Sequence, residues 1–126
     1  MEGMIHMKPI DLERVQQILT NSIGKDVYVH LETTNGAYAS HFNNEAVNVG
    51  AYIRNARISF SQAKIVQDDA SFRVGLKMDF GWVYAEGLSD FEEFNGALLL
   101  AGHDAEGRVM VSLQISDQPF AQEIVE

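Results

Sequence analysis

Apolar and polar residues alternate with a period of two through much of this chain, and this pattern restricts the fold more than any other feature. In the segment 27–32, Val27, Val29 and Leu31 alternate with larger polar or amphipathic residues, and the segment 109–115 repeats the pattern. Successive side chains of a strand point to opposite faces, so the alternation predicts half-buried β-strands. The sequence therefore predicts a mostly β protein.

Turn signals divide the chain into short strands. The strands expected beside the two above cover residues 37–42, 47–53, 57–60, 72–79, 82–86 and 97–103, and the turns between strands lie at Asn35-Gly36, Asn55-Ala56, Phe80-Gly81 and Asp104–Gly107. About eight short strands with regular turns are typical of a single antiparallel β-barrel or a two-sheet sandwich. The pattern does not choose between these two architectures.

A helical period occurs once, in Ile10–Ile23, where Asp11 is placed as the N-cap and Gly24 as the end. The fold class is thus β with one N-terminal helix. We expect residues 1–7 to be a disordered extension and residues 8–120 to form one β-rich domain. Pro119 marks the end of sheet pairing, because proline cannot donate to a ladder, and residues 121–126 form a C-terminal tail.

Composition excludes several classes of function. The formal charge of −9 repels phosphate backbones and anionic lipids, so we expect neither nucleic acid nor membrane as a partner. There is no cysteine, which excludes disulfides, thiolate nucleophiles and cysteine-ligated metals. With neither a signal peptide nor an apolar run of about 18 residues, we expect a cytoplasmic protein. The oligomeric state stays open.

The Asn35-Gly36 turn leads to the first candidate site. A two-residue loop would place His30 directly opposite His41, with Glu32 on the same face. Two imidazoles and one carboxylate would hold a divalent metal with positions open for water. The alternative interpretation is a solvated polar face of a hairpin, and it is favoured because no spacing motif such as HExxH supports a metal.

A second candidate is a ligand or partner face of Trp82, Tyr84 and Glu86, which share one side of a strand, with His103 elsewhere at a hairpin edge. The alternative is that the two aromatic rings belong to the core. For His103 and Asp104 we favour a polar hairpin corner over a catalytic dyad, because neighbouring residues of a strand face opposite ways. The charged run 90–93 is interpreted as a solvated loop.

Three long blocks resemble the YojF-like family of uncharacterised bacterial proteins: GKDVYVHLETTNGAYASHF (24–42), RVGLKMDFGWVYAEGL (73–88) and LLLAGHDAEGR (98–108). The resemblance covers roughly residues 7–120. It brings no catalytic residue with it, because the family has no established activity. It implies genomic company with LmbE-like zinc-dependent N-deacetylases that act in bacillithiol synthesis.

These observations together favour a non-catalytic accessory or binding protein, with the LmbE-like deacetylase as its partner. One alternative is a small metal-dependent hydrolase or cupin-like enzyme that uses His30, His41 and Glu32. Another is a metabolite-binding barrel for a thiol or an amino sugar. The absence of any phosphate loop or nucleophile elbow from the sequence favours binding over catalysis.

Overall fold

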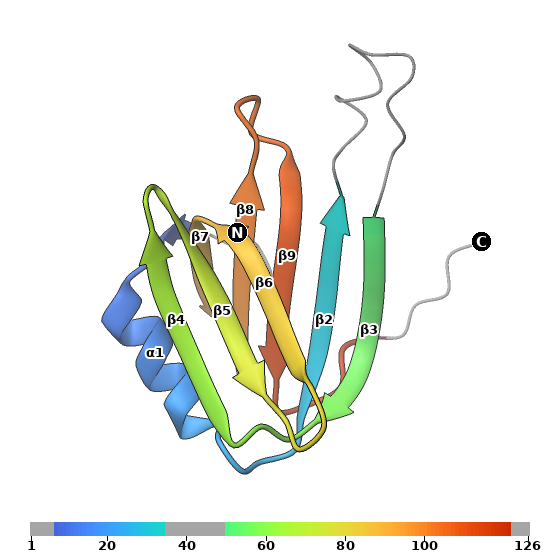
Figure 1. Cartoon of the computed structure of the whole chain (residues 1–126). Coiled ribbons are helices and arrows are strands. Elements are labelled where there is room, and N and C mark those ends of the chain that lie inside the picture. Colours follow the sequence, from blue (N-terminus) through green and yellow to red (C-terminus); the bar gives the residue numbers. More distant parts are fainter. Residues whose placement is uncertain (1–6, 35–49, 122–126) are drawn as a thin grey trace, which may run out of the picture.

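The structure, a computed structural model, describes residues 7–34 and 50–121. Two β-sheets stack face to face, with one helix against the edge of the front sheet (Figure 1). The elements are β1 (Lys8–Pro9), α1 (Leu12–Asn21), β2 (Val27–Thr34), β3 (Gly50–Ile58), β4 (Gln62–Asp68), β5 (Ser71–Lys77), β6 (Trp82–Leu88), β7 (Asp90–Phe94), β8 (Ala97–His103) and β9 (Val109–Ser116).

The large sheet has the strand order β1-β7-β8-β9-β2-β3, and the small sheet has the order β4-β5-β6. All neighbouring strands are antiparallel. Within the described ranges the strands close into no ring, so the barrel alternative is wrong. The mostly β fold with one helix is confirmed, and its two layers fit the sandwich alternative.

The core lies between the two sheets and is filled by the inward-facing residues of alternating strands. The sequence pattern predicts Val29, Leu31, Phe60, Leu100, Val111 and Leu113 as core residues. All of them except Leu31 are buried, and Leu31 is partly buried against the others. The period-two pattern therefore identified the inner face of the large sheet correctly.

The predicted helix is confirmed as α1. Its N-cap is Asp11, whose carboxylate accepts a hydrogen bond from the backbone N–H of Arg14 at 3.2 Å. Val15 and Leu19 are buried one helical turn apart, so this face of α1 packs on the core. Gly24 follows with φ 82°, a left-handed conformation that ends the helix and favours glycine.

The side chain of Gln16 covers the free edge of β4. Its Nε2 donates to the carbonyl oxygen of Ala63 at 3.0 Å, and its Oε1 accepts from the backbone N–H of Ile65 at 3.0 Å. One side-chain amide thus makes the two hydrogen bonds that a neighbouring strand would otherwise make. Unpaired edge groups are sites of aggregation, so α1 both fills the core and protects this edge.

We expect Gln16→Leu to lower the free energy of unfolding by about 1–3 kcal/mol, because two partly buried backbone groups of β4 lose their partners. Chemical denaturation measures this change. The matched control is Gln17→Leu on the exposed side of the helix, which should stay within about 0.5 kcal/mol of the parent. Equal stability of the two variants would contradict the edge-covering role.

The chain passes from the small sheet to the large one between β6 and β7. Gly87 has φ 79°, and the backbone N–H of Ser89 donates to the carbonyl of Ala101 at 2.8 Å. At this crossing the carbonyl oxygen of Gly87 lies directly against Gly102 of β8, so close that a Cβ on Gly102 would overlap it. The two sheets therefore approach each other here at backbone distance, which only a residue without a side chain permits.

The hairpin predicted at Asn35-Gly36 is wrong in its register. β2 is a central strand, with β3 on one side and β9 on the other; Thr34 pairs with Gly50, and His30 lies opposite Gln114. The predicted direct opposition of His30 and His41 is therefore wrong. The strand predicted at 37–42, with His41 itself, lies outside the described residues.

Two further predictions are wrong because the segments concerned lie within strands and not between them. The segment around Asn55 is a bulge within the continuous strand β3, because Arg54 and Asn55 together oppose His30. The charged run 90–93 is not a loop but part of β7, which returns to β8 through Asn95-Gly96, both at positive φ. The hairpins β5–β6 and β8–β9 are confirmed.

Candidate functional site

The outward face of the small sheet carries two exposed aromatic rings. Trp82 is 61% exposed and Tyr84 is 51% exposed, so the core-packing alternative is wrong for both. A Cβ placed on Gly75 of the neighbouring strand would lie 3.5 Å from each ring, which shows that both rings lean over this glycine. We call Trp82, Tyr84 and Gly75 the aromatic face. In Figure 1, β5 and β6 lie in the front layer.

Two lysines border the aromatic face. Lys77 pairs with Trp82, and Lys64 pairs with Gly75, which in turn pairs with Tyr84, so antiparallel register places all of them on the same side. Both lysines are exposed, and among the described residues neither has an ion-pair partner. The aromatic face thus has a locally basic rim on a chain whose net charge is −9. Glu86, also exposed, lies farther along β6.

His30 is buried, with 5% of its surface exposed, although it lies on the outward side of the large sheet. Its Nε2 is 3.3 Å from Glu32 Oε1, and its Nδ1 is 3.3 Å from Arg54 Nη1. A guanidinium can only donate, so in a neutral ring Nδ1 accepts and Nε2–H donates to Glu32. Tyr52 contacts the ring edge-on at a centroid distance of 5.2 Å. The structure therefore brings His30 and Glu32 together and joins Arg54 to them.

No group of three possible metal ligands occurs within residues 7–34 and 50–121. The metal hypothesis for His30, His41 and Glu32 stays a prediction, because His41 is outside those ranges. The guanidinium of Arg54 beside Nδ1 is a feature that the sequence did not indicate. It results from the β3 bulge, which turns Arg54 toward a histidine 24 residues earlier in the chain.

His103 is not brought together with Trp82 and Tyr84, because it lies on β8 of the large sheet. Its Nδ1 is 3.7 Å from Asp90 Oδ1 on the adjacent strand. Asp104 accepts backbone hydrogen bonds from Arg108 and Glu106, both at 2.9 Å, and these bonds hold the pKa of its carboxyl below the ordinary value. Asp104 is therefore the turn former of the hairpin corner.

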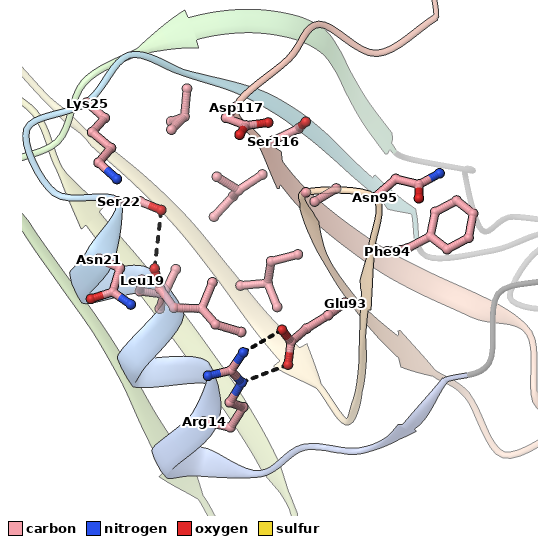
Figure 2. Close-up of a pocket in the computed structure, with 16 residues that line it drawn as sticks. Arg14, Leu19, Asn21, Ser22, Lys25, Glu93, Phe94, Asn95, Ser116 and Asp117 are labelled. Carbon is pink, nitrogen blue, oxygen red and sulfur yellow. Dashed lines mark hydrogen bonds and ion pairs between the residues drawn. The ribbon is translucent and has the colours of Figure 1, made fainter.

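A pocket of about 410 Å³ lies between α1 and the ends of β7, β8 and β9 (Figure 2). Its floor is apolar and includes Ile18, Leu98 and Ile115, while Lys25 and Asp117 contribute opposite charges to its wall. This volume falls in the range of small-molecule sites. Sequence reasoning missed the pocket, since its lining comes from three separate segments of the chain.

Arg14 and Glu93 join α1 to β7 beside this pocket through two hydrogen bonds of 2.7 Å, the two parallel dashed lines in Figure 2. The hydrogen bond from Arg14 holds the pKa of the Glu93 carboxyl below its ordinary value and raises the pKa of Arg14. Both carboxylate oxygens of Glu93 are therefore engaged by Arg14, and the ionised form is favoured. This makes Glu93 poorly suited to act as a general acid or base.

Residues 9–120 match a family described as "Protein of unknown function (DUF1806)". The chain belongs to this family. It is 47% identical over 115 residues to "Uncharacterized protein YojF" of Bacillus subtilis (strain 168), an alignment that covers 90% of this chain and 98% of the relative. The crystal structure of the Bacillus subtilis YojF protein superposes with a TM-score of 0.73 at 42% identity, covering 91% of this chain and 97% of that one.

Membership in the DUF1806 family confirms the resemblance that the three sequence blocks indicated. The family description assigns no activity, so the roles of residues in this DUF1806 chain have to be argued from its own geometry. In the described part of the chain, no helix is both long enough and apolar enough to cross a membrane.

Proposed function

We propose that this chain is a cytoplasmic, non-catalytic accessory protein that binds a protein partner through its aromatic face. The observation that carries this proposal is the exposure of Trp82 and Tyr84, at 61% and 51%, on a regular strand. Large exposed rings cost hydration free energy in the isolated protein, and they are the residues most enriched among binding hot spots.

The geometry of the aromatic face supports a preformed interface. The rings are held on β6 within a three-stranded sheet, and Gly75 leaves them room to lie flat against the neighbouring strand. A rigid surface loses little conformational entropy on binding. Lys64 and Lys77 at its rim would complement acidic side chains around an apolar centre on the partner.

The partner we propose is the LmbE-like N-deacetylase of bacillithiol synthesis, which the family resemblance implies as a genomic neighbour. An accessory role is supported by the lack of a catalytic constellation in the described ranges, where the best acid–base candidates are engaged in ion pairs or turns. The accessory protein would then act by binding the enzyme and not by chemistry of its own.

We expect Trp82→Ala to weaken binding to the deacetylase by more than about 1 kcal/mol, because it removes the largest ring of the proposed hot spot. Its melting temperature should stay close to that of the parent, since the ring is mostly exposed. Calorimetric titration of the purified deacetylase, together with a thermal melt of each variant, gives both quantities.

The matched control is Phe80→Ala. Phe80 is fully exposed in the β5–β6 loop and lies outside the aromatic face, so its removal should change neither binding nor stability. Equal loss of binding in the two variants would show a general effect of surface aromatics. Absence of binding by the parent protein would remove the deacetylase from the proposal.

A metal-dependent hydrolase is the rival proposal, supported by the pairing of His30 with Glu32 at 3.3 Å. Elemental analysis of the purified protein tests it: a stoichiometric divalent metal that is lost in His41→Gln would support the rival and contradict a purely accessory role.

The pocket beside α1 supports a second kind of binding, that of a small metabolite such as a thiol or an amino sugar. Opposite charges on its wall and an apolar floor suit a small molecule with both polar and apolar parts. A rise of the melting temperature with such compounds, abolished by Leu98→Trp, would support this function. A rise that persists in Leu98→Trp would place the ligand elsewhere.

A further inference from the structure

The chain beyond β9 is held against β3 by contacts to its backbone. The side chain of Asn55 donates through Nδ2 to the carbonyl of Phe120 at 2.8 Å, and its Oδ1 accepts from the N–H of Phe120 at 2.7 Å. Arg54 Nη2 donates to the carbonyl of Ala121 at 2.9 Å. Figure 1 shows the segment that follows β9 passing β2 toward β3.

The side chain of Phe120 is also recognised. The guanidinium of Arg54 lies 5.0 Å from the centre of the Phe120 ring, and the His30 ring meets it edge-on at 6.4 Å. These distances suit a cation–π contact and an aromatic pair. Backbone contacts give affinity for an extended peptide of any sequence, while the ring contacts favour an aromatic residue at this position.

The bulge of β3 builds this arrangement. Arg54 and Asn55 together oppose His30, and Asn55 has φ 60°, which re-aims two consecutive side chains toward the same passing segment. Asn55, held at positive φ, thus bonds both backbone polar groups of one residue, Phe120, through its side-chain amide, and this geometry is already in place before any other segment binds. Asparagine is among the few residues that adopt this conformation readily.

We propose that the bulge of β3 is a peptide-binding site for an extended segment with an aromatic residue, that residues 118–121 are its resident ligand, and that the same segment of a second copy of this chain takes their place by exchange. This inference is independent of the aromatic face on the small sheet.

A second copy of this chain is a suitable source of the exchanged segment, because its residues 118–121 would make the same contacts as the resident ones. The described part of the segment after β9 joins no sheet, and the contacts of its last two residues are made to the side chains of Arg54, Asn55 and His30. A segment from another copy would make the same bonds. As in domain swapping, the free-energy cost of exchange then comes mainly from bringing two molecules together in place of a segment that is already tethered to the site.

Two complementary variants test the exchange in the full chain. Phe120→Ala keeps the site but lacks the aromatic ligand, and Asn55→Gly keeps the ligand but lacks the amide. Glycine is chosen because it tolerates φ 60°, so that only the side chain is lost. We expect each variant to sediment as a monomer and the mixture, at high micromolar concentration, to contain a heterodimer.

A synthetic peptide of residues 116–123, SDQPFAQE, gives a second readout that is independent of dimer formation. It should bind Phe120→Ala at least about tenfold more tightly than the double variant Phe120→Ala/Asn55→Gly, since loss of both amide bonds costs of this order. The same peptide with alanine in place of phenylalanine should bind both proteins weakly, with no preference for Phe120→Ala over the double variant.

Equal binding of the phenylalanine peptide to both proteins, or no binding, would overturn the peptide site. Peptide binding with a mixture that stays monomeric would overturn the exchange between copies. If Phe120→Ala does not fold, Phe120→Leu replaces it in both measurements, because leucine keeps apolar contact but lacks the ring.

Discussion

Gly102→Ala is expected to lower the free energy of unfolding by more than about 3 kcal/mol, beyond the usual range for overpacked cores. The added methyl would overlap the carbonyl oxygen of Gly87 and lie 2.9 Å from Val111 Cγ1. The obstacle is backbone, which cannot move aside by rotating a side chain. β6 and β8 would have to separate where the two sheets meet. Chemical denaturation, or failure to obtain folded protein, gives the result.

Gly81→Ala is the matched control for this change. Gly81 lies in the β5–β6 loop, and the nearest atom to an added Cβ is Met78 Cε at 3.9 Å, an ordinary contact. Neither glycine has a positive φ, so backbone conformation does not separate them. We expect Gly81→Ala to remain within about 1 kcal/mol of the parent. Similar destabilisation of both variants would contradict the close approach of Gly87 and Gly102.

Phe60→Ala is expected to cost about 3–5 kcal/mol, the range for deleting a buried aromatic side chain. Phe60 is 1% exposed and has the largest side chain among the fully buried residues. It follows β3, where the chain passes from the large sheet to the small one, and its carbonyl accepts from Gly24 N–H at 3.0 Å. Its ring therefore fills the core where both sheets and the end of α1 meet. Equilibrium denaturation with an unchanged m-value would measure the loss.

Phe80→Ala serves as the control here too, because it deletes the same atoms from a fully exposed position. Its stability should lie within about 0.5 kcal/mol of the parent. Should Phe60→Ala unfold at the same denaturant concentration as Phe80→Ala, the position of Phe60 in the core would be wrong.

Elements with local signals were predictable from the sequence. The helix was found because Asp11, the apolar spacing of Val15 and Leu19, and Gly24 all act within a few residues. The β8–β9 hairpin was found for the same reason, since Asp104 bonds the backbone of its own turn. The alternation of apolar and polar residues with a period of two likewise identified the buried face of β9, which includes Val111, Leu113 and Ile115, although the neighbouring strands were not known.

The candidate sites depended on more than local signals. The alternation in β6 placed Trp82 and Tyr84 on one side, but the same pattern fits a core strand and a surface strand equally well. Their exposure follows from the position of the small sheet, whose outward side no described element covers. The pocket beside α1 could not be predicted, because Lys25 and Asp117 are brought to one cavity only by the packing of the helix against the sheets.

The sequence by itself determined the β class, the single helix, most of the core and the family, because periodicity, caps and long blocks that resemble one family are properties of continuous segments. Only the tertiary structure decided which strands pair. β2 offers two edges, and its partners β3 and β9 are chosen by the burial of the whole large sheet, not by the Asn35-Gly36 signal that follows it. That choice places Arg54 and Asn55 opposite His30 and brings Phe120 against them. The sequence could not show it, because the pairing of distant strands depends on the free energy of the whole fold and not on local signals.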